Sequence, residues 1–205
     1  MDFWFSMYGV KTGDLSIYIN TSDTLTLLWR QSGNKGQEWL NGRVKILSSR
    51  GYRLVIEGII GNSFSSDIAI DDIEFIDKSC SIFPANADPS TIITSTTTRT
   101  SRPIRPPTSP YDCNFENDYC NYTINFNGNS FDWIRVQGKR GDVLAGPLDA
   151  DHTTGESYGW YIQAPIDGQL LGARASFQSP LINDGVKCLS FYYYIQTNTP
   201  FILNI

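Results

Sequence analysis

A stretch rich in serine, threonine and proline divides the chain. Residues 81–110 contain 18 such residues out of 30. A segment of this composition cannot bury enough apolar surface to offset the entropy lost on ordering. We therefore expect an extended, solvated spacer, either O-glycosylated or unmodified. The chain must then fold from two separate segments, residues 1–80 and 111–205.

Both segments carry apolar residues spaced like those of strands. Leu15, Ile17 and Ile19 alternate with Ser16 and Tyr18, a period typical of a half-buried strand. No window has the stripe of an amphipathic helix, and aromatic residues reach 13%, which favours strands. The expected fold class is all-β. Strands are expected at residues 15–19, 25–29, 44–46, 52–56, 68–70, 73–75, 159–164, 175–179 and 189–195.

The alternation slips by one residue at Asp71-Asp72. Ile68 and Ile70 precede the slip, and Ile73 and Phe75 follow it. A β-bulge at this point would keep both apolar pairs facing the core.

Charge and hydropathy exclude two classes of partner. The net charge is −5, and no block of Lys or Arg is present. Nucleic-acid binding depends on clustered cations that neutralise phosphates, so we expect none here. The sequence also lacks a run of about 18 apolar residues, and no transmembrane segment is expected.

Other features point to the outside of the cell. The four cysteines form no CxxC pair, and sequons for N-glycosylation begin at Asn20 and Asn121. Composition alone leaves open whether the cysteines are paired or are buried free thiols. The N-terminus lacks the basic start and apolar core of a signal peptide. We therefore expect a fragment of a longer extracellular protein.

One pattern occurs twice, at an offset of 188 residues. Residues 3–7 align with residues 191–195, and Leu15 and Ile17 align with Leu203 and Ile205. Two copies of one strand pair would compete for the same place in a sheet. We expect the first copy to occupy it, because its chain continues into the remaining strands. Residues 196–205 would then lie at an edge.

The order of several short motifs resembles that of the MAM family, named for meprin, neuropilin and the mu-type receptor phosphatase. The second segment resembles the amino-terminal part of a MAM module, and the first segment resembles the carboxy-terminal part. The order of the two parts is thus the reverse of the family's. The motifs are Cys113-Asn114-Phe115-Glu116, Phe131-Asp132-Trp133, Asp151-His152-Thr153-Thr154, Gly159-Trp160-Tyr161-Ile162 and Cys188-Leu189-Ser190-Phe191, with Leu28-Trp29, Gly36-Gln37-Glu38-Trp39 and residues 67–80 in the first segment.

The resemblance implies an extracellular jelly-roll β-sandwich that mediates adhesion or protein association. It implies a disulfide between Cys113 and Cys120. Cys80 and Cys188 match the family's other pair, and within this chain they could pair only with each other. The two segments would then assemble as one circular permutant.

Catalysis is not expected. His152 is the one histidine, and no nucleophile motif accompanies it, so a structural use is favoured. Asp71 and Asp72, with Glu116 or Asp151, are the candidate carboxylates of a glycosidase. Adjacent strand residues point to opposite faces, however, so the two aspartates could share a cleft only at a bulge.

A structural cation site is a further expectation. Calcium prefers six to eight oxygen ligands, chiefly from carboxylates and carbonyls. Glu116, Asp151 and Asp72 are the candidate ligands. The alternative for each acid is a solvated charge or a side chain that caps a turn.

The leading hypothesis is a non-catalytic module of a multi-MAM protein. Its partners would be extracellular or cell-surface proteins, including other copies of itself. The rival hypothesis is a carbohydrate-binding jelly roll that serves an enzyme domain outside this chain. A carbohydrate-binding module would expose a planar aromatic platform. The exposure of Trp4, Trp39, Trp133 and Trp160 therefore discriminates between the two.

Overall fold

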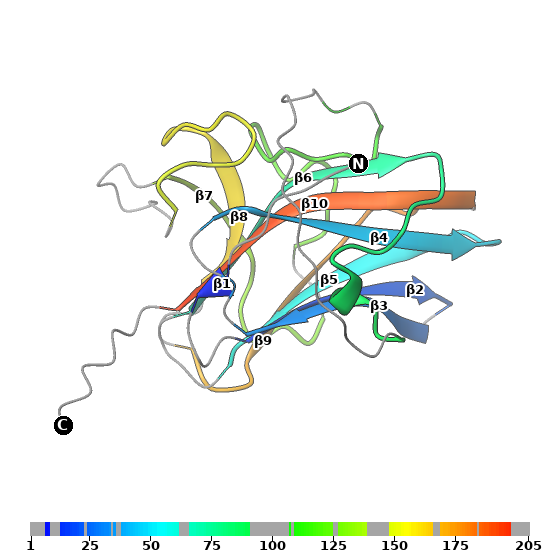
Figure 1. The fold of residues 1–205 in the computed structure, drawn as a ribbon, viewed down its shortest axis with the longest axis horizontal. Coiled ribbons are helices and arrows are strands. Elements are labelled where there is room, and N and C mark those ends of the chain that lie inside the picture. Colours follow the sequence, from blue (N-terminus) through cyan, green and yellow to red (C-terminus); the bar gives the residue numbers. More distant parts are fainter. Residues whose placement is uncertain are drawn as a thin grey trace.

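Two β-sheets pack against each other around a large apolar core in the computed structural model (Figure 1), and a second, smaller apolar cluster is also buried. Their strands confirm the expected all-β class. The only helix among the described residues is a short 3-10 turn, η1 (Ala85–Ala87). The structure describes residues 7–8, 13–22, 24–33, 35, 38–61, 66–90, 107, 109–124, 127–138, 148–165, 169–183 and 185–197.

The larger sheet, sheet A, has six strands, and the smaller, sheet B, has four. All strand pairs are antiparallel except the pair formed by β1 and β10. The order in sheet A is β1 (Met7–Tyr8), β10 (Gly185–Thr197), β6 (Ser66–Ile76), β8 (Trp160–Ala164) and β7 (Ile134–Gln137), with β4 (Leu40–Ser48) also paired to β10. The order in sheet B is β3 (Thr24–Ser32), β2 (Asp14–Thr21), β5 (Arg53–Ile59) and β9 (Arg174–Gln178).

The two sequence segments interleave within both sheets. Strand β10, from the second segment, lies between β4 and β6, which come from the first (Figure 1). Strand β9 of the second segment extends sheet B by pairing with β5. The two segments therefore build a single sandwich.

Only part of each copy of the repeated pattern lies within the described residues. Residues 191–195 lie in β10, whereas Leu15 and Ile17 lie in β2 of sheet B. The expectation that the first copy would occupy the contested place is therefore wrong for the first strand of the pair. Strand β10 already pairs with β4 from Gly185 onward, so residues 191–195 enter the sheet as its continuation. The expected edge position is also wrong for Gln196, which pairs with β6 on one side and with β1 on the other. Residues 1–6 and 198–205 lie outside the described residues.

The expected bulge in β6 is confirmed. Ser190 lies opposite Glu74 and Tyr192 lies opposite Asp71, so β6 has one residue more than β10 between these pairs. Asp72 adopts a left-handed backbone conformation with φ of 48°. Ile70 and Ile73, on either side of the slip, are both buried in the same core.

Aromatic side chains from the two segments meet in the core. The ring of Trp29 on β3 lies edge-on to Phe191 and Tyr193 on β10, with centroid distances of 5.2 Å to each. The ring centroids of Trp133 and Phe177 lie 5.1 Å apart. Trp133 also donates a hydrogen bond from Nε1 to the carbonyl of Ala175 at 3.0 Å. Such edge-to-face pairs add to the stabilisation that comes from area burial.

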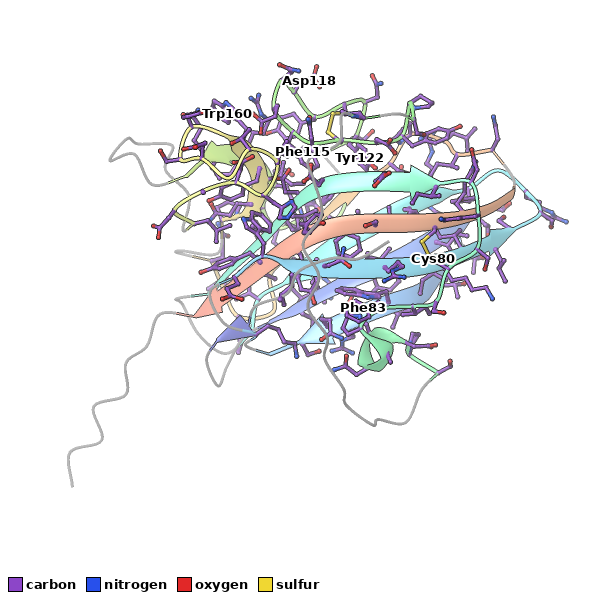
Figure 2. The ribbon with its side chains drawn as sticks, turned by 45° about the horizontal axis from the view of Figure 1, so that its top comes forward. Cys80, Phe83, Phe115, Asp118, Tyr122 and Trp160 are labelled. Carbon is purple, nitrogen blue, oxygen red and sulfur yellow. A yellow bond between two sulfur atoms is a disulfide. The ribbon has the colours of Figure 1, made fainter. Side chains whose placement is uncertain are left out.

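Apolar residues at the start of the proposed spacer, Ile82 and Phe83, pack against the sandwich. The backbone of Phe83, which is labelled in Figure 2, exchanges two hydrogen bonds of 2.9 Å with Arg43 on β4, and its carbonyl accepts a third from Trp29. Ala87 is buried. The expected extended, solvated spacer is therefore wrong for residues 81–90, because their apolar side chains find a surface to cover. Residues 91–106 lie outside the described residues.

Both cysteine pairs form disulfides. Cys80, which follows β6, is bonded to Cys188 in β10 with a Cα–Cα distance of 5.6 Å. Cys113 is bonded to Cys120 across a short loop, also with a Cα–Cα distance of 5.6 Å. The Cys80–Cys188 bond joins the two segments covalently.

Candidate functional site: an acidic cluster at the bulge of β6

Four carboxylates gather where three parts of the chain meet. Asp71 and Asp72 lie at the bulge of β6, Glu116 follows the Cys113 bridge to β6, and Asp151 lies in the loop before β8. Electrostatic coupling links Asp71 with Asp72 and Asp151, and Glu116 with Asp151 and Asp72. The structure thus brings together all three acids that the sequence suggested as cation ligands.

Asp71 is the most deeply placed member and is fully buried. Its Oδ2 accepts hydrogen bonds from the backbone N–H groups of His152 (2.9 Å) and Thr153 (3.1 Å). Burial, and then the neighbouring Asp72 and Asp151, raise the pKa of Asp71 well above its usual value. Asp71 was not among the predicted ligands, although the slip in alternation marks its position.

The bulge turns the side chain of Asp72 toward the same neighbours as Asp71. The hydroxyl of Thr153 lies 2.8 Å from Oδ1 of Asp72 and 3.3 Å from Oδ1 of Asp71. Side chains at adjacent positions of a regular strand point to opposite faces. The additional residue of the bulge removes that alternation here, so the two aspartates can share one site.

Asp151 organises its own loop. It accepts hydrogen bonds from the N–H and hydroxyl groups of Thr154 at 2.7 and 2.6 Å, and from the N–H of Glu156 at 3.2 Å. A Cβ atom added at Gly159 would lie 2.2 Å from the carboxylate of Asp151. The chain must therefore have a glycine at this position for Asp151 to be buried.

Glu116 connects the cluster to β8. Its Oε1 accepts a hydrogen bond from the N–H of Trp160 at 3.0 Å. Burial, joined by the charge of Asp151, raises the pKa of Glu116 to about 7. Trp160 lies beneath the guanidinium of Arg135 at 4.1 Å, and Arg135 donates a hydrogen bond to the carbonyl of Glu116.

His152 is held by its surroundings. Its Nδ1 lies 2.6 Å from Oδ2 of Asp72, and its ring stacks on Tyr192 with centroids 3.2 Å apart. The rings of Trp39 and His152 make an edge-to-face contact. These contacts hold the imidazole in place, as the structural use favoured from the sequence requires.

The cluster has hard oxygen ligands of the kind that calcium prefers. Four carboxylates, the Thr153 hydroxyl and the nearby carbonyl of Asn114 supply them. In the described part of the chain, no three His, Cys, Asp or Glu side chains are arranged to hold a metal ion. The carboxylates are oriented instead by N–H and O–H donors. A cation bound here would replace some of the hydrogen bonds that the Thr153 hydroxyl now makes.

Trp39, Trp133 and Trp160 do not form a platform for sugar rings. Trp133 is buried, and Trp39 is half-buried, with its Nε1 donating to the carbonyl of Ala150. One face of Trp160 is covered by Arg135. These three side chains give the carbohydrate-binding hypothesis no support, and Trp4 lies outside the described residues.

The two sequons lie at the ends of strands or in turns. Asn121 is exposed and has a left-handed backbone conformation with φ of 69°. Asn20 is half-buried near the end of β2, just before the turn to β3. Glycosylation at either position remains a prediction.

Comparison with protein-family models identifies the architecture. The model described as MAM domain, meprin/A5/mu, matches residues 1–81 and 113–205. The chain belongs to the MAM family. The two matched stretches correspond to the two segments that interleave in the sandwich, and the interval between them contains most of the Ser/Thr/Pro-rich stretch.

Curated MAM proteins match over a little more than a third of the chain. MAM domain-containing glycosylphosphatidylinositol anchor protein 2 of Mus musculus is 38% identical over 81 residues, which is 38% of this chain and 8% of the relative. MAM domain-containing protein 2 of Homo sapiens is 38% identical over 77 residues, covering 37% of this chain and 11% of the relative. Thyroid hormone-induced protein B of Xenopus laevis is 36% identical over 83 residues, covering 39% and 12%.

The matched stretch therefore corresponds to about a tenth of the length of these relatives. No solved structure gave a significant match. No helix in the described part of the chain has the length and apolar character needed to cross a membrane.

Proposed function

We propose that this MAM chain is a non-catalytic association module of extracellular proteins. The observation that carries the proposal is the bonding of its acidic cluster. Asp71, Asp151 and Glu116 each accept hydrogen bonds from backbone N–H groups, which hold loops in place. All four cysteines are in disulfides. The bonds of Asp71 and Asp72 to His152 and Thr153 thus join the two segments, whereas those of Asp151 and Glu116 hold loops within the second.

Several features support a location outside the cell. Disulfides persist in oxidising compartments. The two sequons would be used only in the secretory pathway. The name of one relative includes a glycosylphosphatidylinositol anchor, a modification that attaches proteins to the outer face of a membrane. The partners we propose are therefore extracellular or cell-surface proteins, with homophilic contacts included.

The test uses the full chain secreted from eukaryotic cells. Beads coated with it are mixed and scored for aggregation, which measures homophilic contact. Labelled chain is also added to cells before and after surface proteolysis, and before and after treatment with glycosidases. Chain unfolded by reduction of its disulfides is the control. Aggregation, or cell binding that proteolysis removes, supports the proposal.

Two outcomes contradict it. Binding that is lost only after glycosidase treatment would favour the carbohydrate-binding alternative. Absence of both bead aggregation and cell binding would remove the association function.

We also propose that calcium occupies the acidic cluster as a structural ion. The supporting observation is the concentration of negative charge: four carboxylates interact electrostatically, one of them is fully buried, and the imidazole of His152 contacts Asp72. Burying a charge without a counter-charge is costly, and a divalent cation would relieve that cost. Asp71, Asp72, Asp151 and Glu116 would hold it after turning from their present N–H and O–H donors, since the described side chains are not now arranged around a metal position.

Calcium should therefore raise the melting temperature above that measured in EDTA. A ligand that binds only the native state stabilises it by about 2.7 kcal/mol at a hundredfold excess over Kd. Glu116→Gln should remove the difference. Asp132→Asn, at an exposed acid outside the cluster, should preserve it. Equal melting curves in EDTA and in millimolar calcium would exclude the site.

A further inference from the structure

We propose that a second copy of this chain can supply residues 109–197, so that two chains complete each other's sandwiches by exchanging segments. Each sandwich of such a dimer would contain the first segment of one copy and the second segment of the other. The inference goes beyond the association function above, because it concerns the chain's own internal interface.

The sheet pattern makes each segment incomplete without the other. In the described strands, β4 and β6 both pair with β10 and not with each other. The first segment alone therefore cannot form sheet A. In the second segment, β7 and β8 pair with each other, and β8, β9 and β10 each pair with a strand of the first segment. Every unpaired edge is a template for the missing strand.

The core contacts impose the same requirement. Trp29 of the first segment packs on Phe191 and Tyr193 of the second. All three side chains are fully buried in the assembled sandwich. A first segment without a second would expose this surface. The free energy gained by burying this surface is the same whichever copy supplies β10, because the contacts are identical.

The peptide connection permits both arrangements. The 18 residues 91–108 separate Ser90, beside η1, from Ser109, and fully extended they could span about 60 Å. As a coil they would span roughly 23 Å. Closure within one chain therefore dominates at low concentration, where the second segment of the same chain is present at the higher effective concentration. Exchange becomes competitive when chains fold at high concentration.

Exchange would also make the acidic cluster a site shared between copies. Asp71 and Asp72 come from the first segment, whereas Glu116, Asp151 and Thr153 come from the second. The hydrogen bonds of His152 and Thr153 to these aspartates would then cross from one chain to the other. Each dimer would contain two such composite sites.

The two disulfides allow a direct test with the full chain. Unlabelled and ¹⁵N-labelled chains are mixed in equal amounts, reduced, unfolded, and refolded at high concentration with oxidised glutathione. Each disulfide forms from two thiols, whose two electrons and two protons convert the oxidised glutathione into two reduced molecules. Dimers and monomers are then separated, and their disulfide-linked peptides are analysed by mass spectrometry.

The prediction concerns the isotopic composition of each linked peptide. In the dimer fraction, about half of the Cys80–Cys188 peptides should combine a labelled and an unlabelled half, because copies pair at random. The Cys113–Cys120 peptides should never do so, since both cysteines belong to one segment. Monomers should contain no mixed peptides of either kind.

Shortening the connection provides a second variant. Stepwise deletion within residues 91–106 should increase the dimer fraction as closure within one chain becomes strained. A cooperative thermal melt of each variant verifies that it has folded. Dimers without mixed Cys80–Cys188 peptides, or shortened variants that remain closed monomers, would overturn the proposal. Neither result would affect bead aggregation, so the association function is tested separately.

Discussion

At the residue scale, Gly159 has a testable steric role. A Cβ atom there would overlap the buried carboxylate of Asp151. Gly159→Ala should therefore displace Asp151 and lower the free energy of unfolding by about 1–3 kcal/mol. Gly51→Ala is the matched control, because its added Cβ meets only ordinary contacts at 3.6 and 3.7 Å. Urea denaturation measures both variants, and equal loss in the two would argue against the overlap.

The acidic cluster should also make stability depend on pH. The pKa of Glu116 is raised from 4.5 to about 7, and that of Asp71 is raised as well. The folded state therefore binds these protons more tightly than the unfolded state does. The corresponding stabilisation is complete below the unfolded pKa and is lost as pH rises through the folded pKa.

In EDTA, the contribution of Glu116 to the melting temperature should consequently decrease between about pH 4.5 and pH 7. Calcium requires the deprotonated carboxylates, so its stabilising effect should increase over the same range. Thermal melts are recorded for the wild type and for Glu116→Gln across this pH range, with and without calcium. The difference between the two proteins gives the contribution of Glu116. A calcium effect that is larger at the acidic end would contradict the assignment.

At the scale of elements, the bulge in β6 determines which residues enter the core. Asp72→Gly should keep the bulge, because glycine tolerates the φ of 48° that it requires. Deleting Asp72 would place Ile73 two positions after Ile70, so a regular strand would direct both side chains to the core without a bulge. We therefore expect the deletion variant to fold, seen as secretion and a cooperative melt, but to lose the carboxylate that lies beside Thr153 and His152. A deletion variant that fails to fold would show that the bulge itself is required.

The strands were predictable from the sequence to different degrees. Leu15, Ile17 and Ile19 alternate over enough residues to predict β2, and the slip at Asp71-Asp72 marked the bulge. Strand β7 was missed because only four residues pair there, and Ile134 at its start is exposed. The convergence of Asp71 with Asp151 was not predictable, because it depends on a loop 80 residues further along the chain.

Which copy of the repeated strand pair occupies the place in sheet A was also not predictable from the sequence. Phe3–Met7 and Phe191–Ile195 have similar patterns, so periodicity could not rank them. Pairing along β10 from Gly185, with the disulfide at Cys188, decides the outcome. These are contacts between distant parts of the chain, which local pattern does not encode.

At the scale of the whole molecule, the two disulfides should contribute unequally to stability. Cys80 and Cys188 are separated by 108 residues, whereas Cys113 and Cys120 are separated by 7. In the chain-entropy model, the longer loop restrains the unfolded state more, by about 4–5 kcal/mol against about 2–3 kcal/mol. Cys80→Ser/Cys188→Ser should therefore cost more stability than Cys113→Ser/Cys120→Ser. Chemical denaturation of both double variants measures the order, and the reverse order would refute it.

The Cys80–Cys188 bond has a consequence for proteolytic processing. Arg99 precedes Thr100, whereas Arg102 and Arg105 precede proline, which blocks trypsin. A cut after Arg99 would leave two polypeptides that stay joined by this bond and by the shared sheets. The cut protein should migrate as one band on a non-reducing gel and as two after reduction. The chain could thus be processed into a two-chain form without losing its fold.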